Sequence, residues 1–165
     1  MGYLEEKQRQ LDMRYLRMAS IWAENSYCVR RKVGALIVKD KMIISDGYNG
    51  TPSGFENVCE DDEGHTKPYV LHAEANAIIS ASRRDMAGGT IYLVGRNAAT
   101  GELLNDATSC LMCRRMIINA GLDRVVIRRT ETEFEVVPVE AWIAEDDLLT
   151  PENVVMDLKL SLIHI

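Results

Sequence analysis

The sequence has no apolar run that approaches the roughly 20 residues needed to span a membrane. It also lacks the pattern of a secretory leader, because residues 1–7 carry acids where a leader would carry bases and then an apolar stretch. We therefore expect a cytoplasmic protein with no membrane partner. Four cysteines without such a leader do not indicate a disulfide framework, so we interpret them as thiols or metal ligands.

An excess of positive charge is also missing. The chain has 19 Lys and Arg against 25 Asp and Glu, which gives a formal net charge of −6. A protein that holds duplex nucleic acid needs a basic stripe that neutralises several phosphates. The one basic run, residues 30–32, is short, so we expect no duplex nucleic-acid partner.

What is present is typical of one globular domain. The 165 residues, 47% hydrophobic and 27% charged, can bury a core without disulfides or a metal to hold it. We expect this single domain to cover residues 1–160. The last five residues, 161–165, match the translation of a sequencing-library adapter, and we interpret them as a non-native tail.

Hydrophobic periodicity predicts alternating helices and strands. Apolar residues at helical spacing predict a first helix within 8–26, and two short apolar runs predict a hairpin over 33–45. A long loop rich in turn residues follows over 47–68. The remaining predictions are helices at 73–84 and 111–119, strands at 90–94, 124–128 and 134–137, and a last helix that opens at 138. This order favours an α/β fold, a three-layer α/β/α sandwich with a mixed, mainly five-stranded sheet.

Two short motifs carry the chemistry. His72 and Glu74 lie two residues apart at a predicted helix start, and Cys110 and Cys113 lie three apart at another. Helix N-termini stabilise thiolates, and one His with two Cys leaves the fourth position of zinc open for water. Bound zinc would lower the pKa of that water from about 15.7 toward about 7, and Glu74 could then carry its proton.

A purely structural interpretation of these residues also exists. His72 would cap a helix, Glu74 would be a solvated acid, and the two cysteines would belong to the core. The order, the helix placement and the spacing would then coincide by accident. We therefore prefer a catalytic zinc site.

The order His-x-Glu followed by Cys-x-x-Cys resembles the pattern of zinc-dependent deaminases. Residues 28–79, with Gly-Tyr-Asn-Gly-Thr-Pro at 47–52 and His-Ala-Glu-Ala-Asn-Ala at 72–77, closely resemble deoxycytidylate deaminases. Residues 110–121 resemble the helix that carries the cysteine ligands of that family. Together these motifs span most of the segment 11–128. The resemblance implies a cytidine-deaminase-like fold.

The resemblance also implies a reaction. In that family Zn²⁺ is held by the residues that match His72, Cys110 and Cys113, and the residue that matches Glu74 is the catalytic acid and base. We therefore expect hydrolytic attack at C4 of a cytosine nucleotide, most simply dCMP, to give dUMP and ammonia.

Substrate contacts are expected in the loop around Asn49, since the Gly-Tyr-Asn-Gly loop contacts the nucleotide in that family. The residues that we assign to substrate binding are Tyr48, Asn49, Gly50, Ala73 and Arg30. Asn-Gly is also a common turn pair, which is the structural alternative for Asn49. The basic run 30–32 could bind a 5′-phosphate, and a solvated surface explains it equally well.

Two features depart from the family pattern. Ser109 stands where the family usually has Pro, and Ser can still cap a helix. The segment 95–107, between a strand and the two cysteines, is roughly ten residues longer than expected, and we call it the insert. Its position beside the zinc ligands makes it a candidate lid. Cys28, Cys59 and His65 could bind a second zinc ion, as in some deoxycytidylate deaminases, although a cysteine at a helix end, as Cys28 is, more often belongs to the core.

Two other functions stay open. One is a different zinc deaminase, acting on a nucleoside, a pyrimidine of the riboflavin pathway or tRNA adenosine, and the acidic charge counts against tRNA. The other is a non-catalytic nucleotide-sensing domain, and the intact Glu74 argues against it. The resemblance further implies a homo-oligomer with dCTP and dTTP as effectors.

Overall fold

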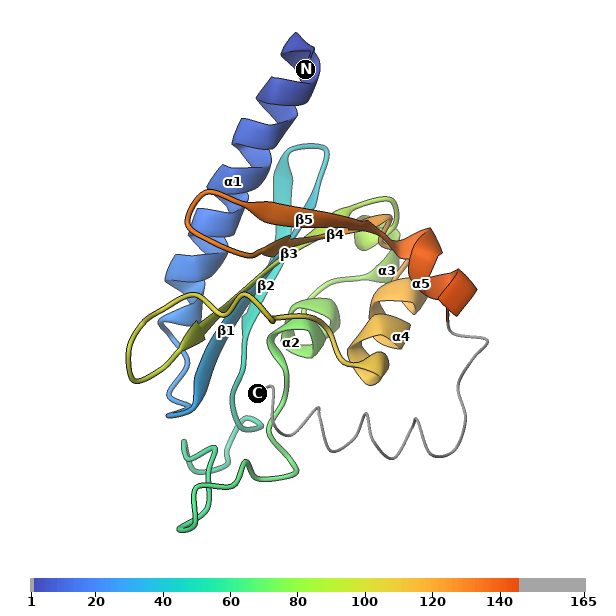
Figure 1. The fold of residues 1–165 in the computed structure, drawn as a ribbon. Helices are drawn as coiled ribbons and strands as arrows, with labels where there is room; N and C mark the ends of the chain where they lie inside the picture. Colours follow the sequence, from blue (N-terminus) through green and yellow to red (C-terminus); the bar gives the residue numbers. More distant parts are fainter. Residues whose placement is uncertain (1, 146–165) are drawn as a thin grey trace.

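The computed structural model describes residues 2–145, which form one five-stranded sheet between two layers of helices (Figure 1). The elements are α1 (Tyr3–Ala23), β1 (Arg31–Lys39), β2 (Met42–Tyr48), α2 (Ala73–Ile79), α3 (Arg83–Met86), β3 (Thr90–Asn97), α4 (Leu111–Asn119), β4 (Arg124–Arg128), β5 (Phe134–Pro138) and α5 (Val139–Glu145). The strand order is β2-β1-β3-β4-β5, with β3 and β4 parallel and the other pairs antiparallel. The predicted three-layer sandwich with a mixed sheet is confirmed.

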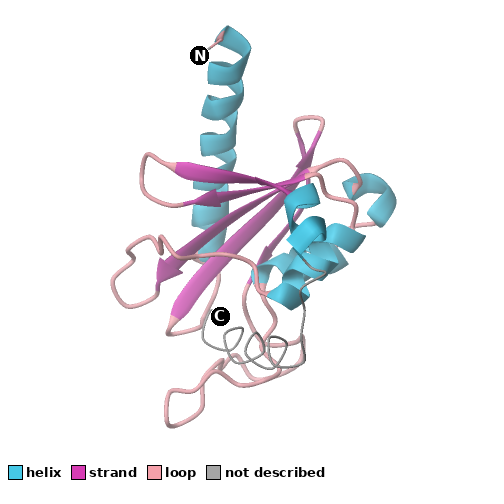
Figure 2. Ribbon diagram, turned by 45° about the vertical axis from the view of Figure 1, so that its right-hand side comes forward, coloured by secondary structure: helices cyan, strands magenta, loops and turns pink. Residues whose placement is uncertain are grey.

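The alternation of side chains along each strand divides the core between the two layers. Ala35, Ile37 and Leu93 point to the face covered by α2 and α4, where they belong to the larger buried cluster. Leu36 and Val94 point to the opposite face, where they pack in the cluster that contains the buried side of α1. Figure 2 shows α1 alone on its side of the sheet within the described residues.

The helix predicted over 73–84 is shorter than expected. It ends at Ile79, and a second helix, α3, begins at Arg83. The Ser82 hydroxyl accepts a hydrogen bond from the Asp85 backbone N–H and so caps α3. Serine side chains compete with the backbone for the hydrogen bonds of a helix. The apolar periodicity therefore continues from residue 73 to residue 84, although the helix is interrupted between Ile79 and Arg83.

Glycine allows both helical layers to approach the sheet closely. A Cβ at Gly34 would lie 2.8 Å from the backbone nitrogen of Ala23 at the end of α1. A Cβ at Gly47 would lie 2.6 Å from the backbone nitrogen of Ala77 in α2. Real side chains do not tolerate such distances, so the two strand glycines set how close α1 and α2 lie to the sheet.

The loop before α2 corrects the interpretation of two cysteines. Cys28 and Cys59 form a disulfide, with their Cα atoms 5.2 Å apart, so they are neither thiols nor metal ligands. The loop folds back onto the start of β1, where the Glu60 carboxylate accepts hydrogen bonds from the Val29 and Arg30 N–H groups. This return brings Cys59 to Cys28, which the sequence spacing did not reveal.

The second zinc site that Cys28, Cys59 and His65 could have formed is therefore excluded in this structure. Both sulfurs are used in the disulfide, and the largely exposed His65 side chain lies beside Asp61 and Glu63 instead. Among residues 2–145, no helix is both long and apolar enough to cross a membrane. The tail predicted over 161–165 lies outside the described residues.

Candidate metal centre

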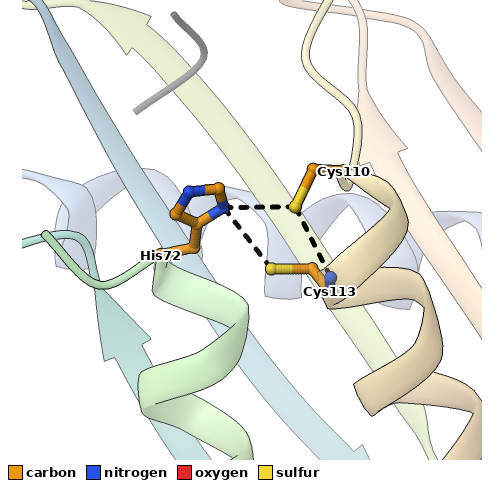
Figure 3. Close-up of side chains that lie close together, drawn as sticks. All are labelled: His72, Cys110 and Cys113. Carbon is orange, nitrogen blue, oxygen red and sulfur yellow. Dashed lines mark hydrogen bonds between the residues drawn. The ribbon is translucent and has the colours of Figure 1, made fainter. Parts of the chain in front are cut away.

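Two helix N-termini meet at the centre of the site. His72 is the N-cap residue of α2 and Cys110 is the N-cap residue of α4, with Cys113 in the first turn of α4. Their side chains converge between the two helices (Figure 3). The Cys110 sulfur accepts a hydrogen bond from the Cys113 backbone N–H at 3.5 Å, as a capping side chain does. The predicted helix placement of both motifs is thus observed.

The distances within this cluster suit a zinc ion. The His72 Nδ1 atom lies 3.7 Å from the Cys110 sulfur and 3.4 Å from the Cys113 sulfur. Zinc binds nitrogen and sulfur at about 2.0–2.3 Å in tetrahedral geometry, which places neighbouring ligand atoms about 3.6 Å apart. One imidazole and two thiolates are also ligands that zinc prefers. The three residues therefore fit the metal, and no fourth protein ligand joins them among residues 2–145.

The two cysteines differ in their acidity because they face each other. The Cys113 side chain donates to the Cys110 sulfur and lowers the pKa of Cys110 to about 3, with further help from His72. The same contact, with burial, raises the pKa of Cys113. Cys110 is therefore the thiolate of the pair even before any metal is considered.

Glu74 lies beside the cluster in a dry environment. Only 3% of its surface is exposed, and burial raises the pKa of its carboxyl above the ordinary value. Nearby His72 opposes this shift, and so to a lesser degree does the Ser109 hydroxyl. That hydroxyl is itself buried and makes no hydrogen bond of ordinary geometry to the described residues. A buried carboxyl whose pKa is raised by desolvation thus lies next to the three ligand side chains.

A narrow cavity leads to this centre. Its volume is about 20 Å³, which is room for about one water molecule. Its walls are formed by Arg31, Val33, Asn49, His72, Ala73, Glu74, Leu93, Gly95, Leu104, Ala107, Thr108 and Cys110. The cavity lies on the face of the sheet that α2 and α4 cover.

Asn49 and Ala73 line the cavity as expected, but Asn49 is already engaged by the backbone. Its side-chain oxygen accepts from the Val33 N–H at 2.9 Å, and its side-chain nitrogen donates to the Arg31 carbonyl at 2.8 Å. With 1% of its surface exposed, it holds the start of β1 in place. The structure thus gives Asn49 a clear positioning role at the wall of the site.

Three expected substrate contacts lie outside the cavity wall. The Tyr48 carbonyl accepts a hydrogen bond from Asn76, and the backbone of Gly50 pairs with Leu71. The Arg30 guanidinium donates to the Thr66 hydroxyl at 3.4 Å. These residues support the loop and α2, and they do not form the cavity surface.

The sequence pointed to the basic run 30–32 and to a lid at residues 95–107, but it singled out Arg30 instead of Arg31 and did not say which lid residues would line the cavity. Arg31, Leu104 and Ala107 form part of the cavity wall, and the Arg31 guanidinium pairs with the Asp106 carboxylate at 3.6 Å. Strand alternation could have found Arg31, because it shares its face of β1 with the apolar residues of the α2 layer. No comparable signal exists for the irregular insert.

Replacement of Gly47 by Ala should disturb the metal centre indirectly, through the position of α2. The new Cβ would collide with the α2 backbone, so the helix that carries His72 and Glu74 must shift. We expect the free energy of unfolding to fall by about 1–3 kcal/mol and zinc affinity to fall with it. Urea unfolding and zinc titration of the variant measure both effects.

Asp46→Ala is the matched control, because Asp46 is the preceding residue in β2 and its side chain is exposed. This variant should keep both values close to those of the parent chain. If Gly47→Ala also kept both, the close approach of α2 to β2 would not be what positions the centre.

The comparisons with known proteins agree with this geometry. Residues 9–129 match the family model of the cytidine and deoxycytidylate deaminase zinc-binding region. The chain belongs to this family of zinc-binding deaminases. It is 33% identical over 129 residues to the deoxycytidylate deaminase of Mycobacterium phage D29, which covers 70% of this chain and 91% of the relative.

Longer relatives match over part of their length. The deoxycytidylate deaminase of Saccharomyces cerevisiae is 32% identical over 155 residues, which is 81% of this chain and 46% of the yeast protein. The chain therefore spans about half of that relative and most of the phage one.

Solved structures show the same fold. The dCMP deaminase of cyanophage S-TIM5, in complex with dCMP and dUMP, is 33% identical with a TM-score of 0.59, covering 78% of this chain and 83% of that one. Cytidine deaminase from Burkholderia pseudomallei, at 22% identity and a TM-score of 0.50, covers 78% and 93% and supports the fold alone.

Proposed function

We propose that this protein hydrolyses dCMP to dUMP and ammonia at the cluster of His72, Cys110, Cys113 and Glu74. The observation that carries the proposal is the buried Glu74 carboxyl beside a three-ligand site whose spacing suits zinc. Similarity to proteins named deoxycytidylate deaminase, one solved with dCMP and dUMP, supports the choice of substrate.

Each side chain has a distinct task in this proposal. Zinc held by His72, Cys110 and Cys113 would supply the Lewis acidity that lowers the pKa of water toward neutrality. Glu74 takes one proton from the attacking water and delivers it to the pyrimidine ring nitrogen. It then takes the remaining proton of that oxygen and delivers it to the amine, which leaves as ammonia while the C4 carbonyl forms. Burial raises the pKa of this carboxyl, which makes it a better proton acceptor than an exposed glutamate.

Arg31 is our candidate for the contact to the 5′-phosphate. It is the one cationic side chain in the described cavity wall, whereas Arg30 is turned toward Thr66. A guanidinium forms strong charge-assisted hydrogen bonds to phosphate oxygens. Arg31 currently pairs with Asp106, so a phosphate would compete with that carboxylate for it.

The insert is proposed as the lid of the site. A cavity of about 20 Å³ cannot hold a nucleotide, since ligand pockets usually measure about 300–1,000 Å³. Leu104 and Ala107 narrow it, and Asp106 ties the insert to Arg31 on β1. Binding of dCMP would break that ion pair and move residues 98–107, which follow the end of β3, outward.

A substrate panel tests the proposed function. Zinc-loaded protein should release ammonia much faster from dCMP than from deoxycytidine, because only the nucleotide offers a phosphate to Arg31. CMP is included to show whether the sugar is also distinguished. A steady-state ammonia assay measures kcat/KM for each compound. Preference for deoxycytidine, or activity only on a riboflavin-pathway pyrimidine or tRNA adenosine, would contradict the dCMP assignment. Zinc binding without any turnover would favour a nucleotide sensor.

The remaining expectations are part of the same proposal. The family resemblance supports a homo-oligomer regulated by dCTP and dTTP, and the chemistry of nucleotide metabolism supports a cytoplasmic location. One catalytic domain over residues 1–160 also stays a prediction. Light scattering gives the oligomeric state, and adding dCTP or dTTP to the dCMP assay reveals an effector.

A further inference from the structure

Ser109 is a buried residue whose hydroxyl has no structural partner. Only 2% of its surface is exposed, and its Oγ is the one fully buried side-chain oxygen or nitrogen in the described residues without a hydrogen-bond partner. The capping role considered for Ser109 belongs to Cys110, the N-cap residue of α4, whose sulfur accepts from the Cys113 N–H. A buried hydroxyl without a partner is unfavourable, so a role other than helix capping must explain it.

The backbone of Ser109 is held firmly by two helices. The Nε atom of Arg114, in α4, donates to the Ser109 carbonyl at 3.1 Å. The Arg114 guanidinium also lies over the buried Trp142 ring of α5, 4.9 Å from its centroid, and pairs with Glu145 at 3.6 Å. Figure 1 shows α5 beside α4. Because these contacts fix the backbone, the main freedom left to the hydroxyl is rotation about the side-chain torsion.

The polar group beside this hydroxyl is the Glu74 carboxyl. The Ser109 hydroxyl lies close enough to lower the pKa of Glu74, although the two groups lack the geometry of an ordinary hydrogen bond. Glu74 is itself 3% exposed, so bulk water does not compete for its oxygens. Rotation of either side chain to another staggered rotamer changes the distance between them. The pair is thus a buried donor beside a buried acceptor.

Zinc binding would remove a competing donor. The Cys113 side chain also shares a hydrogen-bonding contact with Glu74. Cysteines bind zinc as thiolates, and a thiolate has no hydrogen to donate. In the zinc-loaded chain Cys113 therefore cannot donate to the Glu74 carboxylate, whereas the Ser109 hydroxyl still can.

We propose that Ser109 is a positioning residue for Glu74. Its hydroxyl donates to one oxygen of the Glu74 carboxylate, which holds the carboxylate in one orientation and leaves the other oxygen to take the proton of the attacking water. This role rests on the proposed function, because it belongs to the same reaction. Orientation of a proton-transfer group affects the chemical step, so its loss should appear in kcat and not in KM.

The Ser109→Ala variant of the zinc-loaded chain tests this role. We expect kcat for dCMP to fall about tenfold, the effect of one lost charge-assisted hydrogen bond, while KM and the zinc bound per chain stay within about twofold of the parent values. Ser109→Thr keeps a hydroxyl and should recover most of the lost kcat. Ser20→Ala is the matched control with the parent kcat, because Ser20 is also buried but lies in α1, on the opposite face of the sheet.

The same substitution in the Glu74→Gln chain separates positioning from a purely structural effect. Without the proton shuttle the hydroxyl has nothing to orient, so Ser109→Ala should then change kcat by less than about twofold. An equal loss in both chains would mean that Ser109 does not act through Glu74. That result, a parent-like kcat in Ser109→Ala, or loss of zinc from this variant would each overturn the proposal.

A crystal structure of the zinc-loaded chain gives a readout that does not depend on activity. The Ser109 Oγ and the nearest Glu74 carboxylate oxygen should lie within about 3.0 Å of each other, and a separation beyond about 3.5 Å would overturn the proposed contact. A chain that turned over no dCMP would contradict the proposed function, and this distance would still support or overturn the contact.

Discussion

The Glu74→Gln variant should lose about 10²- to 10⁴-fold in kcat for dCMP, the usual contribution of a general acid and base. Gln has the shape of Glu but cannot take a proton and pass it on. The change is buried and leaves His72, Cys110 and Cys113 intact, so the variant should still bind zinc. Steady-state kinetics and metal analysis of the same preparation measure both properties.

Glu140→Gln provides the control for this substitution, since Glu140 is exposed in α5 and should keep the parent kcat. A Glu74→Gln variant that turned over dCMP at the parent rate with zinc bound would show that Glu74 is not the proton shuttle. A variant without zinc would instead show that Glu74 supports the metal site.

The Arg31→Ala variant should change which substrate the protein prefers. Loss of charge-assisted hydrogen bonds to the phosphate costs about 1.5–3 kcal/mol, which is about 10- to 150-fold in kcat/KM for dCMP. Activity on deoxycytidine, which has no phosphate, should change far less. The ratio of the two kcat/KM values is therefore the measurement, because a general defect would lower both together.

Arg30→Ala is the matched control, one residue away with its guanidinium outside the cavity wall. We expect it to keep the parent preference for dCMP. If Arg30→Ala reduced the ratio and Arg31→Ala did not, the phosphate would bind at Arg30, beside the loop, and the assignment of Arg31 would be wrong.

The sequence predicted the sheet, its helices and the metal cluster because each has a local signal. Short continuous apolar runs mark β1 and β3, and His72, Glu74, Cys110 and Cys113 lie in short motifs at helix starts. Side chains three residues apart in a first helical turn must lie close together. The pairing of α2 with α4 then follows from a three-layer fold.

The residues of the cavity wall could not all be predicted from such local signals. Within the basic run 30–32, only the register of β1 decides that Arg31 faces the zinc centre and Lys32 faces α1. The Cys28–Cys59 disulfide depends on how an irregular loop folds back, and residues far apart in sequence give no local sign of it. The inner side of the insert, with Asp106 at Arg31, is equally non-local.

Titration of metal-free protein with zinc, while dUMP formation from dCMP is followed, tests the central claim most directly. The site formed by His72, Cys110 and Cys113 predicts that the rate rises in proportion to added zinc and reaches a plateau at one zinc ion per chain. Full activity without metal, or no dUMP with one zinc ion bound per chain, would contradict zinc-dependent deamination of dCMP at this centre.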